Sequence, residues 1–128
     1  MTTIVTGGTK GIGLAIARRL ARPGGKMVLA YHADEAAAES AQASLRLAGA
    51  VVTLARCDIG TIEGAAALME TAAELGEPVE TLVHNAAMIY PTTLLEADLE
   101  RFTQAIHTNG LSLLYLVQKA MPLLVRGS

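Results

Sequence analysis

The sequence lacks an excess of positive charge and has only one cysteine. Its 128 residues include 10 Lys and Arg against 12 Asp and Glu, which gives a formal net charge of −2. The basic residues are scattered, whereas a nucleic-acid or anionic-membrane surface needs clustered Lys and Arg. The single cysteine, Cys57, rules out an internal disulfide and is typical of a reducing compartment. We therefore expect a cytoplasmic protein that does not bind nucleic acid.

Long hydrophobic runs are missing as well. The longest apolar run near the end covers residues 111–125, and Ser112, Gln118 and Lys119 interrupt it. A bilayer span takes about 20 apolar residues, so a buried helix is the better interpretation. The first residues carry neither a basic region nor a long apolar stretch, so no signal peptide is visible. These features predict a soluble protein without a membrane partner.

The chain does have ample apolar material, 52% of its residues, arranged with two alternating periods. Short apolar or β-branched runs predict strands, and segments with helical spacing predict helices. The expected strands are 2–6, 26–31, 51–56 and 79–84, and the expected helices are 11–21, 34–48 (capped by Asp34), 61–75 and 96–125. Such alternation indicates a parallel sheet covered on both faces. Right-handed crossovers then favour a doubly wound α/β fold.

A glycine-rich turn joins the first expected strand to the first expected helix. Gly7, Gly11 and Gly13 have the spacing G-x-x-x-G-x-G. Glycines at such a turn permit a sharp bend, close approach of the backbone to a pyrophosphate, and close packing of helix on strand. The free N–H groups at the helix start provide an anion site, to which Thr9 can add a hydroxyl and Lys10 a positive charge. The turn therefore predicts nucleotide binding.

The same turn resembles the cofactor loop of the short-chain dehydrogenase/reductase family, which reads T-G-x-x-x-G-[IL]-G. Thr6, Gly7, Gly11, Ile12 and Gly13 match it residue by residue. The resemblance implies a Rossmann fold, an NAD(P) cofactor and hydride transfer between a nicotinamide and a small carbonyl or alcohol substrate. An enoyl thioester substrate, which some relatives reduce, is also compatible.

Three further stretches resemble the family in the same order along the chain. Asp58, followed by Ile59, matches the aspartate that contacts the adenine ring in the family. Asn85 and Ala86 match the family's N-N-A-G motif, although the flanking His84 and Ala87 depart from it. Asn109, after Thr108, matches the asparagine that helps to organise the family's proton relay. The resemblance thus implies cofactor contacts at the first two stretches and one catalytic residue, Asn109.

The end of the second expected strand favours NADP over NAD. An acidic side chain there would hydrogen-bond the ribose of NAD and repel a 2′-phosphate. Tyr31 stands at that place, and Lys10 and His32 are both able to face a 2′-phosphate. Asp34, only two residues further on, is the counter-argument. We interpret Asp34 as the cap of the following helix, with ribose binding as the alternative.

Tyr115 and Lys119 have the spacing of the family's catalytic Tyr-x-x-x-Lys pair. In the family that pair lies well downstream of the asparagine, on a later helix, with a catalytic serine on the strand between them. Tyr115 follows Asn109 by six residues within one expected helix, about 240° around it at 100° per residue. We interpret Tyr115 as a packing residue. The three histidines are far apart and have no metal-ligand spacing.

Family members are about twice as long as this chain, so we expect a fragment of a complete reductase rather than a true short protein. The fifth strand, with the catalytic serine, would begin where the sequence stops. The four strands present would have the order 3-2-1-4, with the fourth as an unprotected edge. The 128 residues alone would then be inactive. The alternative is a non-catalytic nucleotide-binding half-domain. The resemblance also implies a homodimer or homotetramer that assembles through the last helix.

Overall fold

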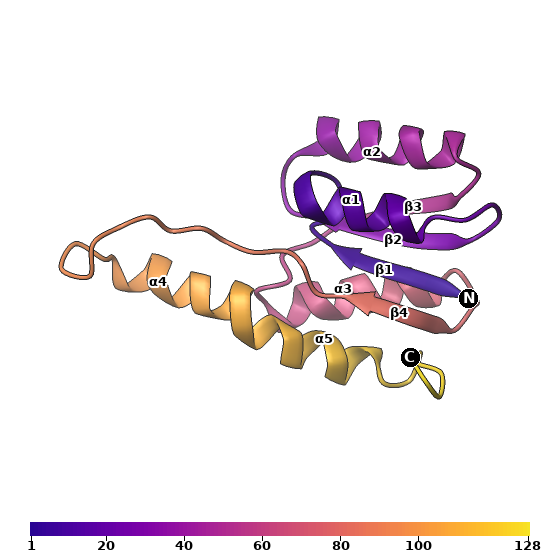
Figure 1. Cartoon of the computed structure of the whole chain (residues 1–128). Coiled ribbons are helices and arrows are strands. Elements are labelled where there is room, and N and C mark those ends of the chain that lie inside the picture. The colour runs from indigo at the N-terminus through magenta and orange to yellow at the C-terminus, as the bar shows by residue number, and fades with distance from the viewer.

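The computed structural model describes residues 1–128 and is built around one parallel sheet of four strands (Figure 1). The strand order is β3-β2-β1-β4, as predicted. Every residue of β1 is buried, because helices cover both faces of the sheet and leave no polar side. The strands are β1 (Thr2–Thr6), β2 (Lys26–Tyr31), β3 (Val51–Arg56) and β4 (Val79–Val83).

Helices cover the sheet in two layers, which confirms the predicted doubly wound α/β fold. The first layer consists of α1 (Gly11–Leu20) and α2 (Glu35–Leu47), and the second of α3 (Ile62–Ala73) and α5 (Ser112–Ala120) (Figure 1). Neighbouring strand residues point into different layers. Ile4 belongs to the 12-residue core cluster beneath α3 and α5, whereas Val5 belongs to the 8-residue cluster beneath α1 and α2.

The expected helix at 96–125 is divided into parts. It consists of α4 (Leu99–Ile106), a π-helical turn η1 (His107–Leu111) and α5, which ends at Ala120. Asp98 caps α4 by accepting a hydrogen bond from the Arg101 N–H. Pro122 follows shortly after this end, and proline has no N–H to donate to the helix. Figure 1 shows α4 and α5 as one arm whose α4 end projects beyond the sheet.

The outer side of β4 is protected at its first residue. Val79 forms a parallel bridge with Leu124, and the Val79 N–H donates to the Leu123 carbonyl at 2.8 Å. This isolated bridge covers the first residue of β4. The remainder of β4 has β1 as its only strand partner. None of the helices has the length and apolar character needed to cross a membrane.

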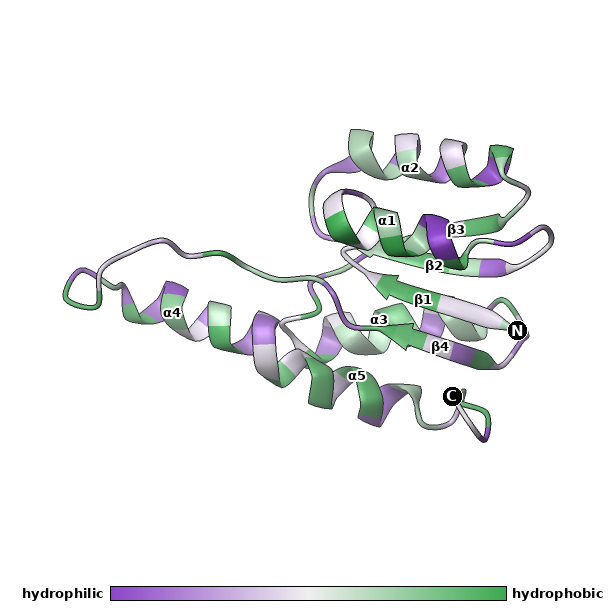
Figure 2. Cartoon of the chain, viewed as in Figure 1, coloured by the Kyte–Doolittle hydropathy of each residue, from purple (hydrophilic) through white to green (hydrophobic).

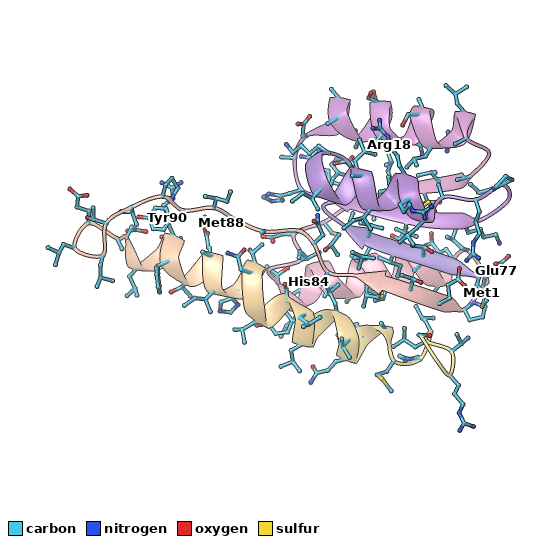
Figure 3. The ribbon with its side chains drawn as sticks, viewed as in Figure 1. Met1, Arg18, Glu77, His84, Met88 and Tyr90 are labelled. Carbon is cyan, nitrogen blue, oxygen red and sulfur yellow. The ribbon has the colours of Figure 1, made fainter.

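Glu77 joins the starts of the two central strands. Its carboxylate pairs with the Met1 amino group and, at 2.8 Å, with the Lys26 Nζ. Figure 3 shows Met1 and Glu77 at the same end of the sheet. The hydrogen bond from Lys26, followed by that from the N-terminal amino group, lowers the pKa of Glu77 from 4.5 to about 2. Glu77 therefore stays ionised well into the acid range.

We predict that Glu77→Gln lowers the stability of the fold at pH 7 but not at strongly acid pH. A carboxyl whose pKa is lowered by folding stabilises the fold above its ordinary value of 4.5, and this contribution is lost as the pH falls through about 2. Urea denaturation of both proteins between pH 7 and pH 2 measures the difference. The matched control is Glu70→Gln, at an exposed position of α3 without an ion pair. A gap between Glu77→Gln and wild type that is as large at pH 2 as at pH 7 would contradict the prediction.

Candidate functional site

The site lies at the carboxyl edge of the sheet, where the loops after β1 and β4 diverge. In open α/β sheets, ligands bind in the crevice at such a switch point. Gly7 and Gly11 have φ angles of 61° and 54°, a backbone conformation that residues with a Cβ rarely adopt. The loop therefore depends on glycine at both positions, as its spacing predicted.

Gly13 lets the start of α1 pack directly against the loop. A Cβ at this position would lie 2.1 Å from the Gly7 carbonyl oxygen and 2.5 Å from the Asn85 Nδ2. Both neighbours are held in place, so the space cannot be widened by a side-chain rotation. This is the close approach that the third glycine of such a loop permits.

A side chain at the end of β1 and one from the segment after β4 clamp the glycine loop to the rest of the sheet. The Thr6 Oγ1 accepts hydrogen bonds from the backbone N–H groups of Asn85, at 3.0 Å, and Ala86, at 3.1 Å. In return the Asn85 Nδ2 donates to the carbonyls of Thr6 at 3.1 Å and Gly7 at 3.3 Å. The side chain of Asn85 thus positions the loop. In the sequence, Thr6 was only a match to the family motif. In the structure it is fully buried, and this clamp depends on its hydroxyl.

The N-terminus of α1 has the features of an anion site. No side chain caps it and its first turn contains no acidic residue, whereas α2, α3 and α4 are capped by Asp34, Thr61 and Asp98. Its first N–H groups have no partner within the helix, and the helix dipole favours negative charge there. These features, and the cradle that the glycines leave open, fit the diphosphate of a dinucleotide.

The side chains around the loop differ in accessibility. Ile12, at the start of α1, is 75% exposed, an unusual position for a large apolar side chain unless a ligand covers it. Thr9 is only 4% exposed. Lys10 is exposed and its Nζ lies 3.0 Å from the Asp34 Oδ2.

The rim beyond the loop is formed by the ends of β2 and β3. Tyr31 is half-buried and pairs in register with Arg56, while His32 is exposed. The Arg56 Nε donates to the His32 carbonyl at 3.3 Å, which places a guanidinium beside this rim. Sequence reasoning missed Arg56. Arg56 could have been found as a basic residue at the end of β3, but only once β3 is known to pair with β2.

Asp58 and Ile59 follow β3 and have different environments. Asp58 is exposed and accepts a hydrogen bond from the Gly60 N–H at 2.9 Å, so the turn presents its side chain at the edge of the sheet. Ile59 is 5% exposed and belongs to the core cluster, which leaves mainly its backbone for a ligand. Burial, followed by the charge of Asp58, raises the pKa of the neighbouring Cys57 thiol to about 11. Cys57 is therefore protonated and a poor nucleophile near neutral pH.

Asn109 lies in the π-helical turn and connects it to the segment after β4. Its Oδ1 accepts from the Met88 N–H at 2.7 Å, and its Nδ2 donates to the Met88 carbonyl at 2.9 Å. Figure 3 shows Met88 and Tyr90 on the extended segment that runs beside α4. A cavity of about 380 Å³ lies between this segment and the helical arm. It is lined by Met88, Tyr90, Thr92, Thr93, Leu94, Ala97, Phe102, Ala105 and Asn109. Single π-turns of this kind occur often at functional sites.

His84 and Ser112 connect the end of β4 to α5. The His84 Nε2 lies 2.6 Å from the Ser112 Oγ, and that hydroxyl donates to the Thr108 carbonyl at 2.6 Å. Since the hydroxyl proton is directed to Thr108, the Nε2 is assigned as the donor in the contact with Ser112. His84, which departs from the family pattern, thus has a hydrogen-bond partner within this chain.

Tyr115 is a packing residue, as predicted. It is half-buried against the 12-residue core cluster, and its hydroxyl lies 3.2 Å from the His107 Nδ1. Lys119 is exposed. The fixed angle of 100° per residue assumed for this helix does not hold, because the π-turn intervenes. Asn109 and Tyr115 nevertheless contact different partners. The structure contains no group of three His, Cys, Asp or Glu side chains able to share a metal ion.

The sequence matches the family model for short chain dehydrogenase over residues 1–128. The chain belongs to the short chain dehydrogenase family. It is 35% identical over 112 residues to an uncharacterized oxidoreductase of Mycobacterium bovis, a match that covers 85% of this chain and 44% of that protein. The chain therefore spans less than half the length of this curated relative.

Among the solved structures that resemble this chain are a dehydrogenase and a reductase. A short chain dehydrogenase from Burkholderia cenocepacia in complex with NADP has a TM-score of 0.92 at 25% identity, covering 98% of this chain and 51% of that one. L-sorbose reductase from Gluconobacter frateurii, complexed with NADPH and L-sorbose, has a TM-score of 0.86 at 28% identity. That match covers 94% of this chain and 46% of the reductase. The short chain dehydrogenase Rossmann fold is thus confirmed.

We predict that Gly13→Ala lowers the free energy of unfolding by about 1–3 kcal/mol, the usual cost of overpacking. The added methyl overlaps the Gly7 carbonyl and the Asn85 amide, so the loop must move. Urea denaturation measures the change. Gly110→Ala is the control, because a Cβ there meets no atom within 4 Å. Equal stability of Gly13→Ala and wild type would show that the loop is not held as described.

Proposed function

We propose that this chain is the NADP(H)-binding part of an oxidoreductase that interconverts a small carbonyl compound and its alcohol. The observation that carries the proposal is the clamped glycine loop, which opens onto the uncapped N-terminus of α1. A bound nicotinamide cofactor supplies the hydride chemistry. The chain itself binds and orients that cofactor.

The cofactor-binding residues surround the carboxyl edge of the sheet. Backbone N–H groups of the glycine loop would hold the diphosphate, and Ile12 would lie against the nucleotide. Asp58 would contact the adenine, while Asn85 and Ala86 would support the loop beside the nicotinamide half. Lys10 and His32 would face a 2′-phosphate, with Arg56 beside them. NADP- and NADPH-bound family members of similar fold support this choice of cofactor.

Asn109 would support the reaction by holding a neighbouring segment in place. Both atoms of its amide bind the Met88 backbone, so it fixes the segment that follows the cofactor-binding residues Asn85 and Ala86. Tyr115 is engaged with His107 and the core, and we assign no chemistry to it. A cytoplasmic setting is compatible with the free thiol of Cys57.

We predict that the purified chain binds NADPH more tightly than NADH by roughly tenfold or more. The 2′-phosphate would gain charge-assisted hydrogen bonds, each worth about 1.5–3 kcal/mol when well formed, and no acidic side chain stands at residue 31. Titration of cofactor fluorescence at fixed ionic strength measures both dissociation constants. NADH, which differs only in the phosphate, is the matched control. Tighter binding of NADH would reverse the assignment, and no binding of either nucleotide would contradict the proposed function.

We also propose that two copies of this chain associate through the arm formed by α4 and α5. One stripe of α5, formed by Ser112, Leu116 and Ala120, is buried, and α5 packs on α3. The opposite stripe is apolar and exposed, and Figure 2 shows apolar residues continuing along the arm. The stripe contains no charged residue, so two copies can meet about a two-fold axis without like-charge repulsion. It consists of Leu99, Phe102, Ile106, Leu113, Leu114, Val117 and Met121.

We predict that Val117→Glu converts a dimeric or tetrameric chain into a monomer. The substitution would bury a charge in the proposed contact, whereas Val117 is already 40% exposed within one copy. Size-exclusion chromatography with light scattering gives the mass directly. Gln104→Glu is the control, because it introduces the same charge at an exposed residue of α4, on the side away from Leu99, Phe102 and Ile106. A wild-type mass of 13.3 kDa in solution would contradict the assembly.

A further inference from the structure

We infer that Asp34 sets the affinity for NADP(H) by competing with the 2′-phosphate for Lys10. The inference rests on the proposed function. It concerns a residue whose sequence interpretation was a choice between a helix cap and a ribose ligand. The structure adds a third contact, the ion pair with Lys10.

The two oxygens of the Asp34 carboxylate have separate partners. The Oδ1 accepts from the Ala37 N–H at 3.1 Å, which caps α2 and confirms the predicted cap. The Oδ2 lies 3.0 Å from the Nζ of Lys10. The hydrogen bond from Lys10, followed by that from Ala37, lowers the pKa of Asp34, so the carboxylate is charged at neutral pH. One side chain thus holds both the start of α2 and the lysine of the glycine loop.

This ion pair is well suited to exchange partners. The side chains of Lys10 and Asp34 are 69% and 48% exposed, and exposed ion pairs are weak. A phosphate monoester carries up to two negative charges and three acceptor oxygens, so it attracts the ammonium more strongly than a single carboxylate does. Lys10 can therefore turn from Asp34 to the phosphate, but the interaction with Asp34 must weaken first.

The surrounding charges make the competition specific to the phosphorylated cofactor. Tyr31 brings no charge to the end of β2, and the Arg56 guanidinium lies beside His32. Asp34 is the acidic side chain at this rim that pairs with Lys10. A nucleotide without the 2′-phosphate does not need Lys10 in this position. Its affinity should accordingly be independent of the ion pair.

The first test compares Asp34→Asn with wild type for both cofactors. Asparagine caps helices as well as aspartate, so α2 is kept while Lys10 is released. NADPH should bind roughly two- to fivefold tighter, the range expected for an exposed ion pair, and NADH should be unchanged. Glu39→Gln is the matched control, since it removes a charge from an exposed position of α2 and should alter neither constant. Circular dichroism and thermal melting check that each variant is folded.

The second test repeats the Asp34→Asn comparison in a Lys10→Gln background. With no lysine to release, the gain for NADPH should fall below about twofold, because the two residues act as a coupled pair. An equal gain in both backgrounds would mean that Asp34 only repels the phosphate, which overturns the inference.

The outcomes separate the inference from the function on which it rests. If wild type binds NADPH but Asp34→Asn is unchanged or weaker, the inference fails and the proposed function stands. Loss of NADH binding in Asp34→Asn would instead assign Asp34 to the ribose. If wild type binds neither nucleotide, the proposed function fails and the inference with it.

Discussion

The hydrogen-bonded contact between Thr6 and Asn85 is the interaction on which the site depends. Two backbone N–H groups converge on the Thr6 hydroxyl, and the Asn85 amide returns two hydrogen bonds to the first loop. Each such bond contributes about 0.5–1.5 kcal/mol net, but loss of the buried hydroxyl would leave two donors unpaired at a larger cost. The contact therefore fixes the glycine loop before any ligand arrives, which reduces the entropy that binding must remove.

The short segment after β4 connects the glycine loop to the helical arm. His84 contacts Ser112 at the start of α5, Asn85 holds the glycine loop, and Met88 is bound at both backbone groups by Asn109. Successive residues thus face different elements. The arm and the glycine loop are thus connected through a few hydrogen-bonded residues. In contrast, β3 lies at the edge of the sheet opposite β4.

The sequence allowed the sheet to be predicted almost residue by residue, because buried parallel strands read as continuous apolar runs bounded by glycine and proline. The strand limits 2–6, 26–31 and 51–56 agree with the structure. The π-turn was not predicted, and its residue Asn109 is bound to Met88, which is 21 residues away and not recognisable as a partner from the sequence. The early end of α5 did have a local signal in Pro122. Ile59, expected at the cofactor, has its side chain in the core cluster, which leaves its backbone for such a contact.

Binding and chemistry are separable in this chain for a physical reason. Every proposed contact to the cofactor comes from the carboxyl ends of β1 to β4, and these four strands pair within the described residues. A tyrosine that exchanges a proton with a carbonyl substrate is favoured by a neighbouring cation and by freedom from other partners, since an unperturbed tyrosine titrates near pH 10. Tyr115 contacts His107 and the core, and Tyr90 binds the Asp98 N–H at 2.8 Å with the Arg101 guanidinium 4.9 Å from its ring centre. Both are held by the arm rather than by the glycine loop, so the clamped loop can act as a nucleotide site whether or not the reacting groups are present beside it.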